Sequence, residues 1–150
     1  MRLLPAEEAG FGNFLNIITI LECIDLPEVI QCNPVFTVWF DIAQKLFGLM
    51  NDVLGLQKDL LYGEEDGIIM FKMRKGTSLN DAVDEELKLL GDYVKDDMEL
   101  IKSLLTEFGE QYVQVATFVK FVDAALHGYP YTFRDSIKYG MKDQIRVDYK

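Results

Sequence analysis

The stretch that decides the fold is VFTVWFDIAQKLFGLMNDVLGLQKDLL, residues 35–61. Its apolar residues recur at spacings of three and four, which places them on one face of a helix of about seven turns. Pro34 suits the first turn of this helix, because a proline has no N–H group to leave unpaired there. Gln57 alone interrupts the rhythm. The apolar set is Phe36, Trp39, Ile42, Ala43, Leu46, Phe47, Met50, Val53, Leu54, Leu60 and Leu61.

The flanking segments also show helical spacing, and no segment alternates like a strand. Ser78 and Asp81 have the spacing of a capping box at the start of a second long helix. Gly128 and Pro130 are expected to end the last helix. We expect an all-α chain with helices near residues 11–22, 35–61, 68–76, 77–110 and 110–127, with a turn at 25–34.

Composition sets limits on function. Hydrophobic residues make up 49% of the chain and aromatic residues 12%, which suffices for a packed core. Fifteen basic and 25 acidic residues give a net charge of −10 without a basic cluster, which argues against binding to nucleic acid or an anionic membrane. The sequence has no apolar run long enough to span a membrane and no signal-peptide pattern, so we expect a cytoplasmic protein. Cys23 and Cys32 are expected to be thiols, because a zinc site would need more Cys or His nearby.

The length of 150 residues suits a single helical domain, residues 1–150. Two helices of about 40–45 Å are nevertheless long for such a domain. They need neighbours along their whole length, so we expect the chain to be part of a larger bundle. The apolar helix faces that such a part would expose predict self-association.

The second half of the 35–61 segment carries candidate metal ligands. Asn51, Gly55 and Asp59 follow at four-residue steps, so they form one slanting line along the helix, turning about 40° per step. An amide oxygen and a carboxylate are the hard ligands that Mg²⁺ prefers. Gly55 cannot coordinate, but it leaves room for a water, and Lys58 can reach a phosphate. The alternative, that these are solvated positions on a polar helix face, stays open.

These letters resemble a known motif. N-D-x-x-G-x-x-K-D is similar to the second metal-binding motif of class I terpene synthases, in which Asn, Ser or Thr, and Glu or Asp hold a Mg²⁺ ion. Asn51 corresponds to the first ligand and Asp59 to the last, with Asp52 and Lys58 in the places common in the family. Gly55 replaces the hydroxyl ligand, as in some family members where water is thought to substitute.

The resemblance extends over about residues 9–140. GFGNFLNIITILECIDLPEVIQCNPVF, residues 10–36, is similar to the family stretch from a helix-break glycine to a Leu-Pro turn. HGYPYTFRDSIKYG, residues 127–140, resembles a C-terminal segment in which Lys138 and Tyr139 occupy the positions of an Arg-Tyr pair. Thr132 stands where the family has tryptophan. Surface roles for Lys138 and Tyr139 remain an alternative.

Two features of the family do not match. The aspartate-rich first metal motif is absent, and the acidic run at residues 95–99 lies after the second motif, where it reads as a solvated helix face. The diphosphate-sensing arginine would fall on Pro5, with Arg2 three residues out of register. The first residues of the chain therefore look unlike the family.

The resemblance implies a fold and an activity. The fold would be a partial helical bundle corresponding to the C-terminal half of the class I terpenoid synthase fold. The activity would be Mg²⁺-dependent ionisation of an isoprenyl diphosphate, such as farnesyl or geranylgeranyl diphosphate, followed by cyclisation of the carbocation. Lys58, Lys138 and Tyr139 would bind the diphosphate, Lys138 and Tyr139 as catalytic residues. One metal site without the aspartate-rich motif implies that the 150-residue chain is inactive alone.

Aromatic residues that could line the cavity are Phe14, Phe47, Tyr131 and Phe133, although ordinary core packing explains each of them as well. Two other functions remain open. One is a non-catalytic acidic helical module that binds partner helices through exposed apolar faces. The other is an unrelated magnesium-dependent diphosphate enzyme with a helical fold.

Overall fold

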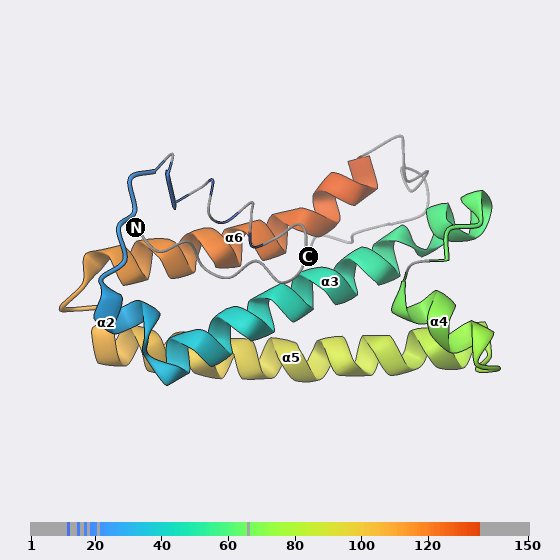
Figure 1. Cartoon of the computed structure of the whole chain (residues 1–150), viewed down its shortest axis with the longest axis horizontal. Helices are drawn as coiled ribbons and strands as arrows, with labels where there is room; N and C mark the ends of the chain where they lie inside the picture. Colours follow the sequence, from blue (N-terminus) through green and yellow to red (C-terminus); the bar gives the residue numbers. More distant parts are fainter. Residues whose placement is uncertain are drawn as a thin grey trace, which may run out of the picture.

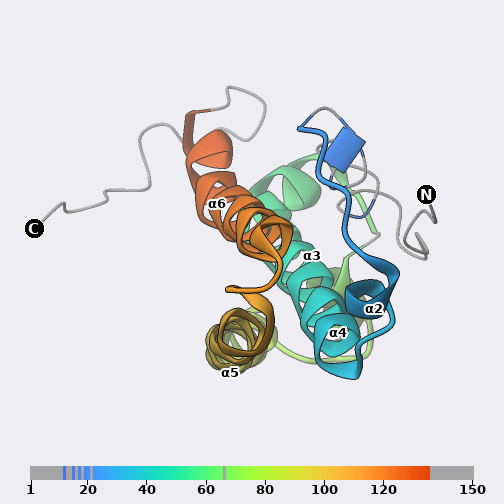
Figure 2. The same cartoon turned by 90° about the vertical axis from the view of Figure 1, so that its left-hand side faces the viewer.

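The computed structural model describes residues 12, 15, 17, 19, 20, 22–65 and 67–135, with the backbone alone for 132–135. Within these residues the structure is helical and contains no strand. The three long helices lie side by side in Figures 1 and 2, with α3 packed mainly against α5 and also against α6. The helices are α2 (Glu28–Gln31), α3 (Pro34–Tyr62), α4 (Ile68–Arg74), α5 (Leu79–Phe108) and α6 (Val113–Asp135). The predicted all-α fold is confirmed.

Helix α3 has well-defined ends. The side chain of Asn33 accepts hydrogen bonds from the backbone N–H groups of Val35 and Phe36, at 2.8 and 3.3 Å. Pro34 occupies the first turn, as predicted. Gly63 ends the helix with φ of 66°, a left-handed conformation that glycine adopts without steric cost. The chain therefore reverses sharply after α3, which brings the following acidic residues back toward the last helical turns.

The predicted cap of the second long helix is confirmed. Ser78 is the N-cap of α5, and its hydroxyl oxygen accepts a hydrogen bond from the Asp81 N–H group at 3.2 Å. The short helix α4 lies between α3 and α5 and packs against the start of α5 (Figure 1). Because α4 contacts both α3 and α5, the start of α5 lies at the end of the bundle where the candidate metal ligands lie.

The predicted end of the last helix is wrong. Helix α6 does not stop at Gly128 and Pro130 but continues to Asp135, with Pro130 inside it. A proline inside a helix removes one backbone hydrogen bond and favours a kink. Residues 128–131 nevertheless stay helical, and Tyr129 among them contacts Asn51 and Phe47 on α3. The segment predicted as a plain turn at 25–34 contains the one-turn helix α2.

The core lies between the first half of α3, the second half of α5 and α6. Phe36, Trp39, Phe40 and Phe118 form an aromatic cluster with ring centroids 5.6 to 6.4 Å apart. The indole N–H of Trp39 donates a 2.9 Å hydrogen bond to the buried carboxylate of Asp97 on α5. This bond pairs the one polar atom of the Trp39 side chain and fixes α3 against α5.

The predicted helix at residues 11–22 falls largely outside the described residues. Of the positions that are described within it, 12, 15, 17, 19 and 20 are helical, and 22 lies in a turn. Leu15 is fully buried and belongs to the core. No helix of the described part of the chain is long and apolar enough to cross a membrane. Cys23 and Cys32 are both exposed free thiols.

Candidate metal centre

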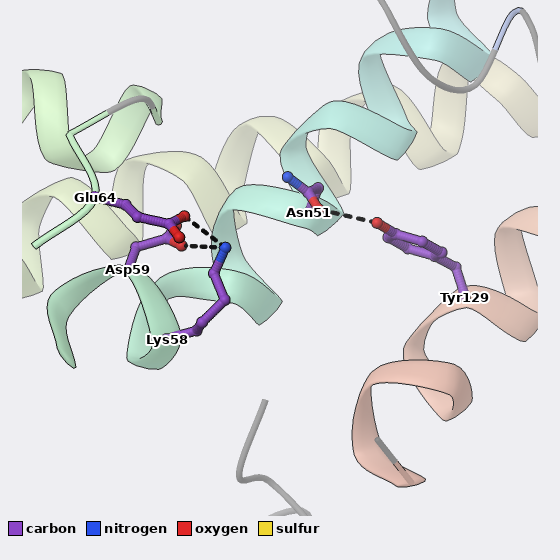
Figure 3. Close-up of polar contacts among 5 residues, drawn as sticks. All are labelled: Asn51, Lys58, Asp59, Glu64 and Tyr129. Carbon is purple, nitrogen blue, oxygen red and sulfur yellow. Dashed lines mark hydrogen bonds and ion pairs between the residues drawn. The ribbon is translucent and has the colours of Figure 1, made fainter. Parts of the chain in front are cut away.

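The candidate ligands Asn51, Gly55 and Asp59 lie on the second half of α3, beyond the aromatic core. Asn51 is exposed, Gly55 is buried, and the Asp59 side chain is 16% exposed. In Figure 3 Asn51 and Asp59 stand apart along the helix, and each contacts a different neighbour. The structure therefore keeps the three residues on one helical segment without a direct contact between the two oxygen-bearing side chains.

Lys58 links the candidate ligand Asp59 to the reversed chain after α3. Its ammonium nitrogen lies 2.9 Å from Asp59 Oδ1 and donates a 2.6 Å hydrogen bond to Glu64 Oε2 (Figure 3). The hydrogen bond to Glu64, and then the contact with Asp59, raise the pKa of Lys58 above its usual value. Lys58 is thus held fully charged beside the carboxylate.

Glu64 is a member of this site that sequence reasoning missed. It lies two residues beyond the end of α3, and its backbone N–H donates to the Asp59 carbonyl at 2.9 Å. The left-handed Gly63 produces this return of the chain. A glycine directly after the last helical residue, followed by an acid, is the signal that could have identified Glu64.

The donor set at Asp59 fits a cation. Apart from the Lys58 ion pair, Asp59 Oδ1 is buried without a hydrogen-bond partner among the described residues. A Cβ atom on Gly55 would lie 3.5 Å from Asp59 Oδ2, so the glycine leaves the space beside this carboxylate open. A buried carboxylate oxygen favours a positive charge next to it, and here the Lys58 ammonium supplies that charge. Asn51 Oδ1 and Asp59 are both hard oxygen donors of the kind that Mg²⁺ prefers.

Asn51 on α3 is contacted by Tyr129 on α6. The hydroxyl of Tyr129 donates a 2.9 Å hydrogen bond to Asn51 Oδ1, the oxygen that an amide offers to a metal (Figure 3). The Tyr129 ring packs on Phe47 with centroids 4.2 Å apart. Sequence reasoning missed Tyr129, because the residue lies 78 positions from Asn51 and beyond the predicted end of the last helix.

Asp52 contacts the start of α4, whereas its neighbour Asn51 contacts α6. Its Oδ2 accepts a 2.8 Å hydrogen bond from the backbone N–H of Ile68, at the start of α4. Burial raises the pKa of Asp52, the Ile68 hydrogen bond opposes this shift, and the charges of Glu86 and Asp59 add to it. Asp52 therefore attaches α4 to the segment of candidate metal ligands and is itself partly desolvated.

An ion pair between α4 and α5 holds α4 in place. Glu86 on α5 is 1% exposed, and its Oε1 lies 2.7 Å from the Lys72 ammonium on α4. Its Oε2 is buried and has no hydrogen-bond partner among the described residues. Lys72 also donates a 2.7 Å hydrogen bond to Glu85. The Lys72 contacts and the Asp52–Ile68 hydrogen bond together place α4 between α3 and α5.

Most of the remaining predicted site residues fall outside the described part of the chain. Lys138, Tyr139 and Phe14 lie outside the described residues, as does the Phe133 side chain. Tyr131 is half-exposed on α6. In the part of the chain that the structure describes, no three His, Cys, Asp or Glu side chains gather as a ready metal cluster.

A hollow of about 450 Å³ on α5 contains none of the candidate ligands. Its walls come from a single helix, at Glu99, Lys102, Ser103, Thr106 and Glu107. Residues at these helical spacings share one outer face. Among the described residues α5 alone borders the hollow, which is there a depression of the helix surface.

The comparison with protein families defines the class. A family model described as "Terpene synthase family 2, C-terminal metal binding" matches residues 6–96, which include α2, α3, α4 and the first half of α5. The chain belongs to this family, and its helical bundle is that of the C-terminal region of class I terpene synthases. No curated protein and no solved structure matches the chain. The family is described as metal-binding, and the candidate ligands of α3 fall within the matched region.

Proposed function

We propose that this chain, residues 1–150, forms a single helical domain that supplies the second metal site of a class I terpene synthase acting on an isoprenyl diphosphate. One observation carries the proposal. Within the region that matches the family, Asp59 presents a buried carboxylate oxygen that is paired with a cation, the Lys58 ammonium at 2.9 Å, next to the space left by Gly55. Such an oxygen is suited to a divalent cation, for which we propose Mg²⁺.

The residues have distinct proposed roles. Asn51 and Asp59 hold the ion, and Gly55 leaves the volume that a water ligand needs. When bound, magnesium supplies positive charge that stabilises a departing diphosphate. Lys58, charged and already beside Asp59, binds the diphosphate, and Lys138 and Tyr139 act on it as the sequence resemblance implies. The substrate is a farnesyl or geranylgeranyl diphosphate that becomes a cyclised carbocation in an apolar cavity.

Metal binding tests the proposal directly. The 150-residue chain is titrated with Mn²⁺ in the presence of inorganic pyrophosphate, and free Mn²⁺ is followed by its electron paramagnetic resonance signal. Asn51→Ala and Asp59→Ala should each weaken Mn²⁺ binding by about tenfold or more, since each removes an oxygen ligand. Chelation by EDTA should release the pyrophosphate together with the metal.

Asp41→Ala is the matched control. Asp41 lies on the same helix, but its exposed carboxylate pairs with Lys45 at 2.6 Å and is outside the motif. This variant should bind Mn²⁺ like the unchanged chain. Absence of Mn²⁺ binding by the unchanged chain, or equal binding by all variants, would exclude the metal site. We further propose that the chain alone does not turn over farnesyl diphosphate.

An interaction module is a second candidate, favoured by apolar residues exposed on α5. Leu87, Val94 and Met98 lie on one side of this helix and are 46, 43 and 67% exposed. A contiguous apolar face of this kind is typical of helix–helix contacts. The module predicts that Met98→Lys changes the sedimentation coefficient of the chain and leaves Mn²⁺ binding unaltered. A monomer that binds Mn²⁺ and pyrophosphate would instead support the metal site.

A further inference from the structure

Tyr129 contacts the one atom of Asn51 that can serve as a metal ligand. The Tyr129 hydroxyl donates to Asn51 Oδ1 at 2.9 Å, from α6 to α3. The amide of an asparagine has two ends, of which only the oxygen accepts hydrogen bonds or coordinates a cation. A donor placed at that oxygen decides which end of the amide faces α6.

The tyrosine is itself held in place. Its ring packs on Phe47 with centroids 4.2 Å apart and planes inclined by 41°. Phe47 precedes Asn51 by four residues on α3, so the two side chains are neighbours on one helix face. The ring contact therefore directs the Tyr129 hydroxyl along the face of α3 toward Asn51. Figure 3 shows the hydroxyl approaching the amide from the α6 side, opposite to Lys58 and Asp59.

The hydrogen bond is compatible with metal binding. A carbonyl oxygen has two lone pairs, so Asn51 Oδ1 can accept from Tyr129 and still offer one lone pair to an ion. Groups that hydrogen-bond to a metal ligand fix its orientation and affect metal affinity. We propose that Tyr129 is a positioning residue for Asn51 and raises the affinity of the α3 metal site through the amide oxygen. This inference rests on the proposed function.

The experiment distinguishes the contribution of the Tyr129 hydroxyl from that of its ring. Tyr129→Phe deletes the donor and keeps the contact with Phe47, so packing between α3 and α6 is preserved. Mn²⁺ binding with inorganic pyrophosphate is measured on the 150-residue chain, and thermal unfolding is measured in parallel without metal. Tyr129→Phe should weaken Mn²⁺ binding by about tenfold, with little change in Tm. Tyr112→Phe makes the same chemical change far from the site and should leave the affinity unchanged.

A double-mutant cycle shows whether Tyr129 acts through Asn51. In an Asn51→Ala background the Tyr129→Phe substitution should produce no additional loss of Mn²⁺ affinity, because the amide that the hydroxyl orients is gone. A purely structural role for Tyr129 would instead weaken binding by the same factor in both backgrounds. Additive losses would therefore overturn the inference.

The failure of the inference can be told apart from failure of the proposed function. If Asn51→Ala weakens Mn²⁺ binding and Tyr129→Phe does not, the inference is wrong and the metal site stands. If the unchanged chain does not bind Mn²⁺, or if Asn51→Ala binds like the unchanged chain, both are wrong. A loss of affinity in Tyr129→Phe that disappears in the Asn51→Ala background supports both.

Discussion

The two halves of α3 belong to one helix but are stabilised in different ways. The first half buries Phe36, Trp39 and Phe40 in the aromatic core. In the second half, from Asn51 onward, the fully buried residue is Gly55, and hydrogen bonds and ion pairs join Asn51, Lys58 and Asp59 to their neighbours. Apolar burial gives large and non-directional stabilisation, whereas ion pairs near the surface contribute little to it. One helix therefore combines a buried aromatic anchor in its first half with a second half that is held by hydrogen bonds and ion pairs.

The largest expected loss of stability comes from removing a buried side chain in the first half of α3. Trp39→Ala removes a fully buried ring and the hydrogen bond to Asp97, and should lower the free energy of unfolding by about 3–5 kcal/mol. Urea unfolding followed by circular dichroism measures this loss. Val38→Ala, next to it but 51% exposed, should change stability by less than about 0.5 kcal/mol. Equal losses in both variants would contradict the division of α3 into two halves.

A smaller effect is expected at the start of the helix. Asn33→Ala removes the acceptor for the first N–H groups of α3 and should cost about 0.5–2 kcal/mol in the same measurement. Asn33→Gly should cost only a few tenths of a kcal/mol, since glycine is tolerated at this position. Identical losses in the two variants would show that the cap does not contribute to stability.

The carboxylate of Asp97 makes the anchor sensitive to pH. Burial raises the pKa of Asp97 above 3.8, and the nearby charge of Asp123 raises it further. The Trp39 hydrogen bond and His127 lower the pKa and offset part of this shift. The folded chain thus holds the Asp97 proton more tightly than the unfolded chain, and this contribution to stability is lost as pH rises from 3.8 through the raised value.

Asp97→Asn keeps an acceptor for Trp39 and removes the titration. The stability advantage of this variant over the unchanged chain should grow as the pH increases from about 4 to 7. Urea unfolding at a series of pH values measures the difference. If the free energies of unfolding of the two chains depended on pH in the same way, burial of the Asp97 charge would not lower stability.

The smallest effect on stability is expected in the second half of α3. Lys58→Gln removes the ion pairs with Asp59 and Glu64 and should change the free energy of unfolding by no more than about 1 kcal/mol. The same variant should weaken pyrophosphate binding in the presence of Mg²⁺, as measured by calorimetry. Lys45→Gln, which breaks the Asp41 pair in the first half, should leave pyrophosphate binding unchanged. A large loss of stability in Lys58→Gln would contradict the comparison.

Local patterns predicted the helices whose ends depend on local chemistry. Apolar spacing and Pro34 indicated α3, and the spacing of Ser78 and Asp81 indicated the start of α5. The end of α6 was predicted wrongly, because packing of α6 along α3 outweighs the cost of placing Gly128 and Pro130 inside a helix. Tertiary contacts, such as that between Tyr129 and Phe47, outweighed the local signal.

Only the part of the candidate site that lies on a single helix could be predicted from the sequence. The metal-ligand motif lies within nine consecutive residues, so spacing alone could define it. Tyr129 and Glu64 could not be assigned in this way. The first depends on how α6 packs on α3, and the second on the reversal of the chain at Gly63. The roles of Lys138 and Tyr139 remain predictions from the sequence.

The chain has one tryptophan, and that residue is fully buried with its indole N–H bound to a carboxylate. Its fluorescence therefore comes from a single environment, shielded from water in the anchoring half of α3. Emission should shift to longer wavelength when the core opens and should barely respond to an ion bound near Asp59. The molecule thus carries an intrinsic optical reporter of unfolding that is insensitive to occupancy of the candidate site.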